Sequence, residues 1–278
     1  MESQKDKKLK ILCLHGFRTS GSFLQKQLSK WDASILSQFD MEFPDGKFPA
    51  GGKSDIEGIF PPPYFEWFQF EKDFTEYTNL EACISYLCDY VTSKGPFDGL
   101  LGFSQGATLC GLLLGYQAQG KLLKEHPTFR FFISISGAKF RQPSICEIAY
   151  KQKIKAKSVH FIGAKDWLKL PSEELASEFH NPLIIRHPQG HTVPRLDEVA
   201  IEQLREWTKT IIQSNTGTTT AAPPLDSNHE LKNGEAKAPV VAASCNKVQT
   251  GQLETSGVII TEKTGTEVEA VQPYFKLE

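Results

Sequence analysis

Apolar and polar residues follow one another in two kinds of block over residues 1–213. Short apolar runs that end in glycine, such as LKILCLHG at 9–16, are typical of parallel strands buried on both faces. Longer blocks with apolar residues three or four positions apart predict amphipathic helices. Because the two kinds alternate, the sequence predicts an α/β fold in which a mostly parallel sheet carries helices on both faces.

The pattern also predicts the order of the elements. Strands are expected within residues 9–16, 40–46, 96–104, 129–137, 157–166 and 182–191. Helices are expected within residues 21–39, 77–93, 104–125, 171–179 and 195–212. The helix at 171–179 begins with Pro171 and Ser172, two residue types that favour a helix start.

Residues 44–74 interrupt this regular pattern. They contain Pro44, Pro49 and Pro61 to Pro63, which exclude long regular elements, together with many aromatic side chains. Irregular segments of this length within a compact domain are usually functional. Two interpretations stay open: the aromatic side chains cover a substrate pocket, or they pack into the core. The candidate pocket residues are Tyr64, Trp67 and Phe68.

The composition changes at Ser214, where the chain becomes polar and rich in Thr, Ala and Pro without periodicity. Such a composition predicts a disordered tail over 214–278 after one α/β domain at 1–213. Some alternation returns around Val258, which leaves a strand or a docking segment open there.

Charge and cysteine content narrow the class of protein. Lys and Arg number 31 against 33 Asp and Glu, which argues against nucleic acid or anionic lipid as a partner. The first apolar run is too short for a secretory signal, and no stretch approaches the roughly 20 apolar residues of a membrane span. Six cysteines without a CxxC pair predict free thiols in a reducing compartment. We therefore expect a soluble cytoplasmic protein, with the nucleus open as a second compartment and the oligomeric state undetermined.

The most informative motif is Gly102-Phe103-Ser104-Gln105-Gly106, which fits the G-x-S-x-G nucleophile elbow. It lies between an apolar strand and an apolar helix, which is the context that this motif requires. The turn lifts the Ser104 hydroxyl out of the sheet at a helix N-terminus, where the helix dipole favours developing negative charge. Ser104 is therefore the predicted nucleophile.

A neutral serine needs a base, and in this architecture the order is serine, acid, histidine. His191 lies in PQGHTVPR, past the carboxyl end of the last expected strand, where sites of open α/β sheets lie. His187, four residues earlier, is the alternative base. His126, His160 and His229 have ordinary structural interpretations.

Asp166 follows the preceding strand and is the predicted acid, which holds the tautomer of His191 and stabilises its imidazolium form. Glu173 and Glu174 are alternatives, but their positions are those of first-turn helix carboxylates. Asp98 precedes the serine and falls at the wrong end of the sheet.

Two backbone N–H groups are expected to form an oxyanion hole. One belongs to Gln105, directly after the nucleophile, and the other to Phe17 in the loop after the first strand. Gly16 lets this backbone approach the site, and His15 is expected to brace the loop rather than act as a second base.

The segments ILCLHGFRTSG, FDGLLGFSQGA, GAKDWLKLPS and GHTVPR together resemble the FSH family of serine hydrolases, over about residues 8–213. The resemblance implies an α/β-hydrolase fold, a triad of Ser104, Asp166 and His191, and hydrolysis of carboxylic esters. One departure is Gln189, where relatives often have glycine. The tail beyond 213 is outside the resemblance.

The leading hypothesis is a hydrolase that forms an acyl-enzyme on Ser104 from a small-molecule ester or thioester, with no metal or organic cofactor. The aromatic content of 44–74 favours an acyl chain over a charged peptide or sugar. A serine peptidase, and a binding protein on a hydrolase scaffold with little or no catalysis, are the alternatives.

Overall fold

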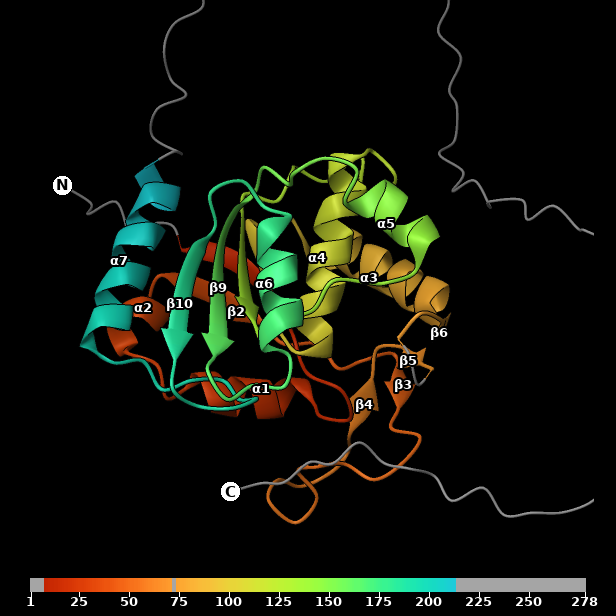
Figure 1. The fold of residues 1–278 in the computed structure, drawn as a ribbon, viewed down its shortest axis with the longest axis horizontal. Helices are drawn as coiled ribbons and strands as arrows, with labels where there is room; N and C mark the ends of the chain where they lie inside the picture. The colour runs from red at the N-terminus through yellow and green to blue at the C-terminus, as the bar shows by residue number, and fades with distance from the viewer. Residues whose placement is uncertain (1–7, 72–73, 214–278) are drawn as a thin grey trace, which may run out of the picture. The chain divides into compact units, whose positions relative to one another are not determined.

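A computed structural model describes residues 8–71 and 74–213, and its centre is a sheet of six parallel strands (Figure 1). The spatial order is β10-β9-β8-β7-β1-β2. The strands are β1 (Leu9–Leu14), β2 (Phe39–Glu42), β7 (Gly99–Phe103), β8 (Phe131–Ile135), β9 (Lys157–Gly163) and β10 (Leu183–His187). The predicted α/β class with a mostly parallel sheet is confirmed, whereas the expected tail at 214–278, including Val258, lies outside the described residues.

The central strands are apolar because both of their faces are covered. Every residue of β7 and β8 is buried. In β1, Ile11 and Cys13 belong to one hydrophobic cluster, while Leu12 and Leu14 belong to the other. Successive side chains of a strand point to opposite faces, so one apolar run supplies both clusters.

Helices complete a layer on each side of the sheet. The first cluster contains side chains of α3 (Leu80–Lys94), α4 (Gln105–Ala118), α5 (Pro143–Ala149) and α6 (Lys169–Ser177). The second contains side chains of α1 (Gly21–Leu28), α2 (Ala33–Leu36) and α7 (Glu198–Gln213). The prediction of helices on both faces is confirmed.

Several expected boundaries are wrong for local reasons. The helix expected at 21–39 is two short helices, because the carboxylate of Asp32 accepts the Ser34 N–H and starts α2 anew. The helix expected at 104–125 ends at Ala118, close to Gly120, which has a φ of +64°. Helix α5 was not expected at all.

Residues 43–71 and 74–79, here called the β2–α3 segment, contain only two-residue strands. These are β3 (Phe48–Pro49), β4 (Phe65–Glu66), β5 (Gln69–Phe70) and β6 (Tyr77–Thr78), which pair as β3–β4 and β5–β6. The prediction that the prolines exclude long elements is confirmed. An isolated bridge between Thr19 and Phe65 ties the segment to the loop after β1.

Two further properties follow from the described residues. None of their helices has both the length and the apolar character that crossing a bilayer requires. Cys13, Cys83, Cys110 and Cys146 carry free thiols, and Cys245 lies outside the described part.

Candidate active site

Ser104 occupies the sharp turn between β7 and α4. Its backbone has φ 53° and ψ −118°, a conformation that non-glycine residues rarely adopt, and its N–H donates to the Ile135 carbonyl at 2.9 Å. A Cβ on Gly106 would lie 2.1 Å from the Leu14 carbonyl oxygen, so the start of α4 rests directly on the end of β1. The turn therefore presents the half-buried serine at the carboxyl edge of the sheet.

His191, in the loop after β10, connects this serine to Asp166. Its Nε2 lies 2.9 Å from Ser104 Oγ, and its Nδ1 lies 3.0 and 3.2 Å from the two carboxylate oxygens of Asp166. A neutral imidazole that donates from Nδ1 to the carboxylate keeps Nε2 as an acceptor for the serine hydroxyl. The ring lies between Phe103 and Trp167, with centroid distances of 5.1 and 5.2 Å. The structure thus brings the three predicted side chains into one hydrogen-bonded chain.

Asp166 follows β9, and its side chain is 1% exposed. Burial disfavours its charged form, but hydrogen bonds from His191, Ser136 and the Leu168 N–H, with the attraction of His191, outweigh this and lower the pKa of Asp166. The Ser136 hydroxyl donates at 2.5 Å and the Leu168 N–H at 2.8 Å. The carboxylate is therefore ionised at neutral pH, and the Ser136 hydroxyl and the Leu168 N–H fix its orientation in addition to His191.

Sequence reasoning missed Ser136. It follows β8 with a positive φ of 52°, at the same edge of the sheet as Ser104 and Asp166. The available signal was a polar residue between an apolar strand and Gly137, the position that Ser104 and Asp166 occupy after their own strands.

The alternative base, His187, and the other histidines have different environments. His187 is 7% exposed at the end of β10, and neither ring nitrogen has a hydrogen-bond partner among the described residues. Burial lowers its pKa, although Asp166 opposes the shift. Burial in β9 lowers the pKa of His160 to about 3, and His126 Nε2 accepts the Phe97 N–H at 2.9 Å. His229 lies outside the described residues.

The alternative acids are placed elsewhere. The half-buried Glu173 carboxylate of α6 pairs with Arg186 at 2.6 Å. Asp98 precedes β7 and accepts the Lys10 N–H at 2.9 Å, at the amino end of the strand. Glu174 also lies on α6, beside Glu173.

The candidate oxyanion donors flank Ser104. Gln105 is the first residue of α4, and the N–H groups of a helix's first turn have no acceptor within the helix. Phe17 follows Gly16 in the loop after β1, and a Cβ on Gly16 would lie 3.6 Å from the Ser104 Cβ. The loop that carries the Phe17 N–H therefore passes directly beside the nucleophile.

His15 braces this loop, as expected. It is fully buried, its Nε2 accepts the Gly46 N–H at 2.9 Å, and its Nδ1 donates to the Gly16 carbonyl at 2.7 Å. Burial, opposed by the Gly16 hydrogen bond and the charge of Asp45, lowers the pKa of His15 to about 4. Its imidazole is therefore neutral and links the loop to the β2–α3 segment.

Two of the three candidate pocket residues are core residues instead. Trp67 is 0% and Phe68 2% exposed. The Trp67 indole N–H donates to the His15 carbonyl at 2.9 Å, and the Phe68 ring packs against Tyr77 and Phe140. Tyr64 is half-buried, with its hydroxyl on the Phe60 carbonyl at 2.5 Å.

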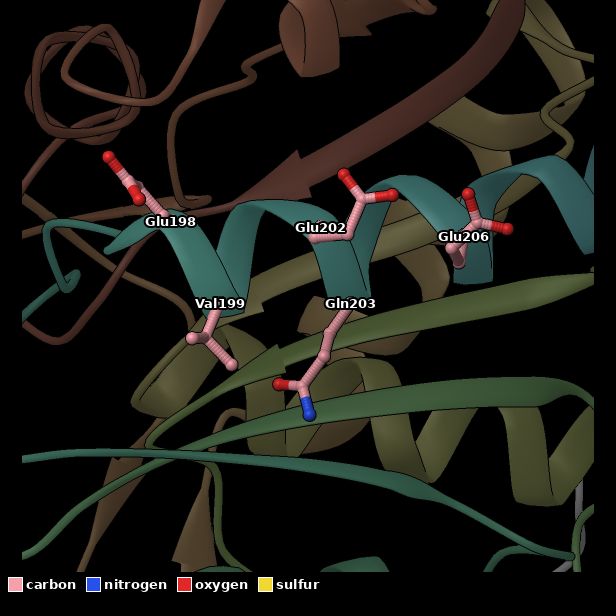
Figure 2. A pocket seen from close by; sticks show the side chains of 5 residues that line it. All are labelled: Glu198, Val199, Glu202, Gln203 and Glu206. Atoms are coloured by element: carbon pink, nitrogen blue, oxygen red, sulfur yellow. The ribbon is translucent and has the colours of Figure 1, made fainter.

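A separate hollow lies along α7, away from these residues (Figure 2). It is lined by Glu198, Val199, Glu202, Gln203 and Glu206. None of Ser104, Asp166 and His191 lines it. Among residues 8–71 and 74–213, no three His, Cys, Asp or Glu side chains are gathered in a way that would hold a metal ion.

Known proteins resemble the chain in sequence. Esterase OVCA2 of Xenopus tropicalis is 30% identical over 203 residues, which cover 67% of this chain and 86% of that protein. Esterase OVCA2 of Homo sapiens is 29% identical over 208 residues, covering 67% and 89%. A dihydrofolate reductase of Schizosaccharomyces pombe is 29% identical over 207 residues, which are 68% of this chain but only 44% of that protein.

Solved structures resemble the chain in fold. Zea mays acyl-protein thioesterase 2 superposes with a TM-score of 0.53 at 16% identity, covering 76% of this chain and 97% of that one. This likeness supports the fold alone. A family model described as "Serine hydrolase (FSH1)" matches residues 1–203. The chain belongs to the FSH1 family of serine hydrolases.

Proposed function

We propose that this protein hydrolyses carboxylic esters through an acyl-enzyme on Ser104, with His191 as the base and Asp166 as the acid that orients it. Its family is one of esterase-type hydrolases, which defines the class of reaction. The observation that carries the proposal is the 2.9 Å contact between Ser104 Oγ and His191 Nε2, continued to Asp166 through Nδ1. This is the order of groups that nucleophilic serine chemistry requires.

In the first half of the reaction, Ser104 Oγ attacks the ester carbonyl carbon while its proton moves to His191 Nε2. The π electrons of the carbonyl move to oxygen and form a tetrahedral oxyanion. When the intermediate collapses, the bond to the alcohol oxygen breaks, and that oxygen takes the proton from His191. The acyl group stays on Ser104 as an ester.

In the second half, water attacks the acyl-enzyme as His191 accepts one of its protons. The new tetrahedral intermediate releases Ser104 Oγ, which recovers the proton from His191, and the carboxylic acid leaves. Asp166 stays ionised throughout and stabilises the imidazolium that forms twice. Its lowered pKa supports this role.

The N–H groups of Phe17 and Gln105 are proposed to hold the oxyanion. One such donor is worth about 10²- to 10³-fold in kcat in serine hydrolases. The positive end of the α4 dipole, which begins at Gln105, adds to the stabilisation.

Apolar side chains near His191 favour an uncharged acyl group as substrate. Trp167 packs on the imidazole and is 53% exposed, and Leu170, three residues further along the chain, is 68% exposed. Thioesters fit the same mechanism, because Ser104 Oγ attacks the same carbonyl carbon and a thiol leaves in place of the alcohol.

A fluorophosphonate probe tests the proposal. We expect the wild-type protein to gain the mass of one phosphonyl group on the peptide that contains Ser104, and Ser104→Ala to gain none. Ser93→Ala, which removes an exposed helix serine, is the matched control and should react like wild type. Labelling of Ser104→Ala at the wild-type rate, or no labelling of wild type, would contradict the proposal.

A panel of p-nitrophenyl esters and matched peptide amides then defines the substrate class. We expect turnover to favour esters with uncharged acyl chains over charged esters and over peptides. Preference for a peptide would support the serine peptidase, and labelling without turnover of any ester would support the binding protein.

A further inference from the structure

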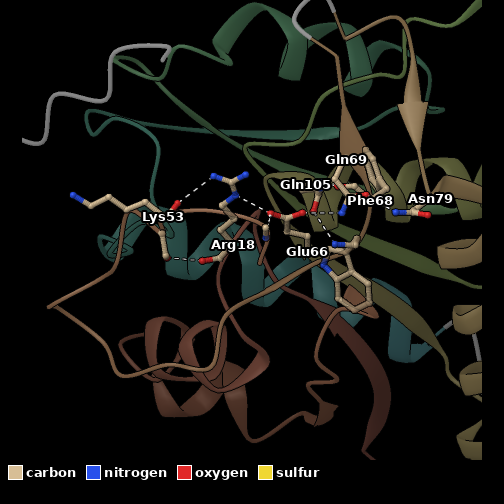
Figure 3. A network of polar contacts seen from close by, with 10 residues as sticks. Arg18, Lys53, Glu66, Phe68, Gln69, Asn79 and Gln105 are labelled. Atoms are coloured by element: carbon tan, nitrogen blue, oxygen red, sulfur yellow. Dashed lines mark hydrogen bonds and ion pairs between the residues drawn. The ribbon is translucent and has the colours of Figure 1, made fainter. Parts of the chain in front are cut away.

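The two proposed oxyanion donors belong to different elements. Phe17 lies in the loop after β1, whereas Gln105 begins α4. Residues 65–68 of the β2–α3 segment contact both of these elements. Figure 3 shows Glu66 bonded to Arg18 on one side and Gln105 beside Phe68 on the other.

On one side, this stretch holds the residues that follow Phe17. The Phe65 N–H donates to the Thr19 carbonyl at 2.7 Å, and Arg18 Nε donates to Glu66 Oε1, also at 2.7 Å. Arg18 has a positive φ of 53°, and its guanidinium lies 4.7 Å from the centroid of the Phe17 ring. The conformation of the residue next to the Phe17 donor is therefore fixed by its side chain.

On the other side, the same stretch holds the side chain of Gln105. The Trp67 N–H donates to Gln105 Oε1 at 3.1 Å, and Gln105 Nε2 donates to the Phe68 carbonyl at 2.7 Å. A carboxamide carries an acceptor and a donor side by side, which suits the N–H of Trp67 and the carbonyl of Phe68. This accounts for glutamine directly after the nucleophile.

Glu66 is the charged centre of this arrangement. Its side chain is 1% exposed, Oε1 accepts from Arg18 and from the Gly51 N–H at 2.9 Å, and Oε2 accepts from Gln69 Nε2 at 2.7 Å. Buried ion pairs add little net stability compared with apolar residues of the same size. The position of this pair, beside the proposed hole, points to a role in geometry.

We propose that Glu66 is a positioning residue for the oxyanion hole: through Arg18 and its neighbours at 65–68 it sets the distance between the Phe17 and Gln105 N–H groups. The inference rests on the proposed function. It extends that function to a residue that does not touch the substrate.

Glu66→Gln tests the proposal with little change in shape. Glutamine keeps the shape and one acceptor oxygen but removes the negative charge that pairs with Arg18, and its NH₂ replaces one of the two oxygens that accept from Arg18 and Gln69. We expect kcat to fall about 10- to 100-fold with an ester substrate, a part of the loss from deleting a donor. The KM should stay within about twofold, because the defect appears only when the oxyanion forms.

The inhibition constant of a trifluoromethyl ketone separates positioning of the oxyanion hole from a merely structural role, which would leave that constant unchanged. It forms a tetrahedral oxyanion on Ser104, so its inhibition constant should rise by the same factor as kcat falls. The matched control is Glu178→Gln, which weakens the ion pair with Lys139 at the end of α6, away from the hole. That variant should leave kcat and the inhibition constant at wild-type values.

Wild-type kcat and inhibition in folded Glu66→Gln would overturn the proposal, even if thermal stability fell. Should this variant not fold, Arg18→Lys decides, because that side chain is 30% exposed and the change keeps the cation. We expect Arg18→Lys to change both values in the same direction, about 3- to 10-fold, since lysine lacks the fork geometry of arginine. No change in either value would overturn the proposal. Failure of the proposed function is seen separately, as activity in Ser104→Ala.

Discussion

The carboxyl edge of the sheet and the β2–α3 segment contribute to the same site in different ways. Ser104, Asp166 and His191 each follow a strand of the central sheet by at most four residues, and the parallel register brings those strand ends together. In the β2–α3 segment the strands have two residues each, and side-chain hydrogen bonds such as that of Glu66 with Arg18 fix the positions. The three proposed catalytic residues are thus placed by the backbone of the sheet, and their surroundings by side chains.

The largest expected effect comes from a substitution at the carboxyl edge of the sheet. Asp166→Asn should lower kcat about 10⁴-fold, because an amide no longer fixes the tautomer of His191 or stabilises its charged form. Steady-state kinetics on an ester measures this change.

Asp98→Asn is the matched control for this prediction, since it makes the same change at the opposite end of the strand before Ser104. Its kcat should equal that of wild type. Similar losses in both variants would mean that the effect comes from the sheet's stability, not from the acid at its carboxyl edge.

The second prediction tests how firmly the β2–α3 segment is anchored. Trp67→Ala should lower the free energy of unfolding by about 3–5 kcal/mol, because the side chain is 0% exposed and its indole also bonds to the His15 carbonyl. Trp167→Ala, at 53% exposure, should cost less than about 1 kcal/mol. Urea unfolding compares the two, and equal losses would show that the segment is only loosely attached.

The smallest expected effect is a loss of folding stability at acid pH. Burial lowers the pKa of His15, which joins the segment to the loop, to about 4, and that of His160, inside the sheet, to about 3. Histidines in the unfolded chain have a pKa near 6.5, so below that pH the unfolded state binds more protons than the folded one. Stability should therefore fall as pH drops, by about 1.4 kcal/mol per pH unit for each such histidine.

His160→Phe sharpens this prediction, because it keeps the aromatic contacts with Phe132 and Phe179 and removes one titrating group. Urea unfolding between about pH 6.5 and 4.5 should show a slope smaller by about 1 kcal/mol per pH unit. An unchanged slope would mean that His160 does not titrate on unfolding as argued.

The reacting groups were predictable from sequence because each leaves a local signal. An apolar run indicates a buried strand, and a polar residue just past the end of that strand, such as Ser104 or Asp166, indicates a candidate active-site residue. The three side chains lie where the sequence order and the G-x-S-x-G turn predict, within 3.2 Å of their neighbours. Their catalytic roles stay proposals until tested.

The surroundings of these residues were not predictable, because they leave no such local signal in the sequence. Glu66 lies among aromatic residues without periodicity, and its partner Arg18 is 48 residues away. The pairing depends on tertiary contacts that no local pattern records. The burial of Trp67 and Phe68 also depends on how a proline-rich segment folds back, which apolar content alone does not decide.

The close contact of Gly106 with Leu14 has a consequence for how this fold tolerates change. The backbone of Gly106 does not need a positive φ, so the missing side chain serves clearance alone. One added methyl group would wedge β1 away from α4 and widen the gap between the loop at Phe17 and the turn at Gln105. The absence of a Cβ at Gly106 thus keeps α4 close to β1, and with it the distance between the loop at Phe17 and the turn at Gln105.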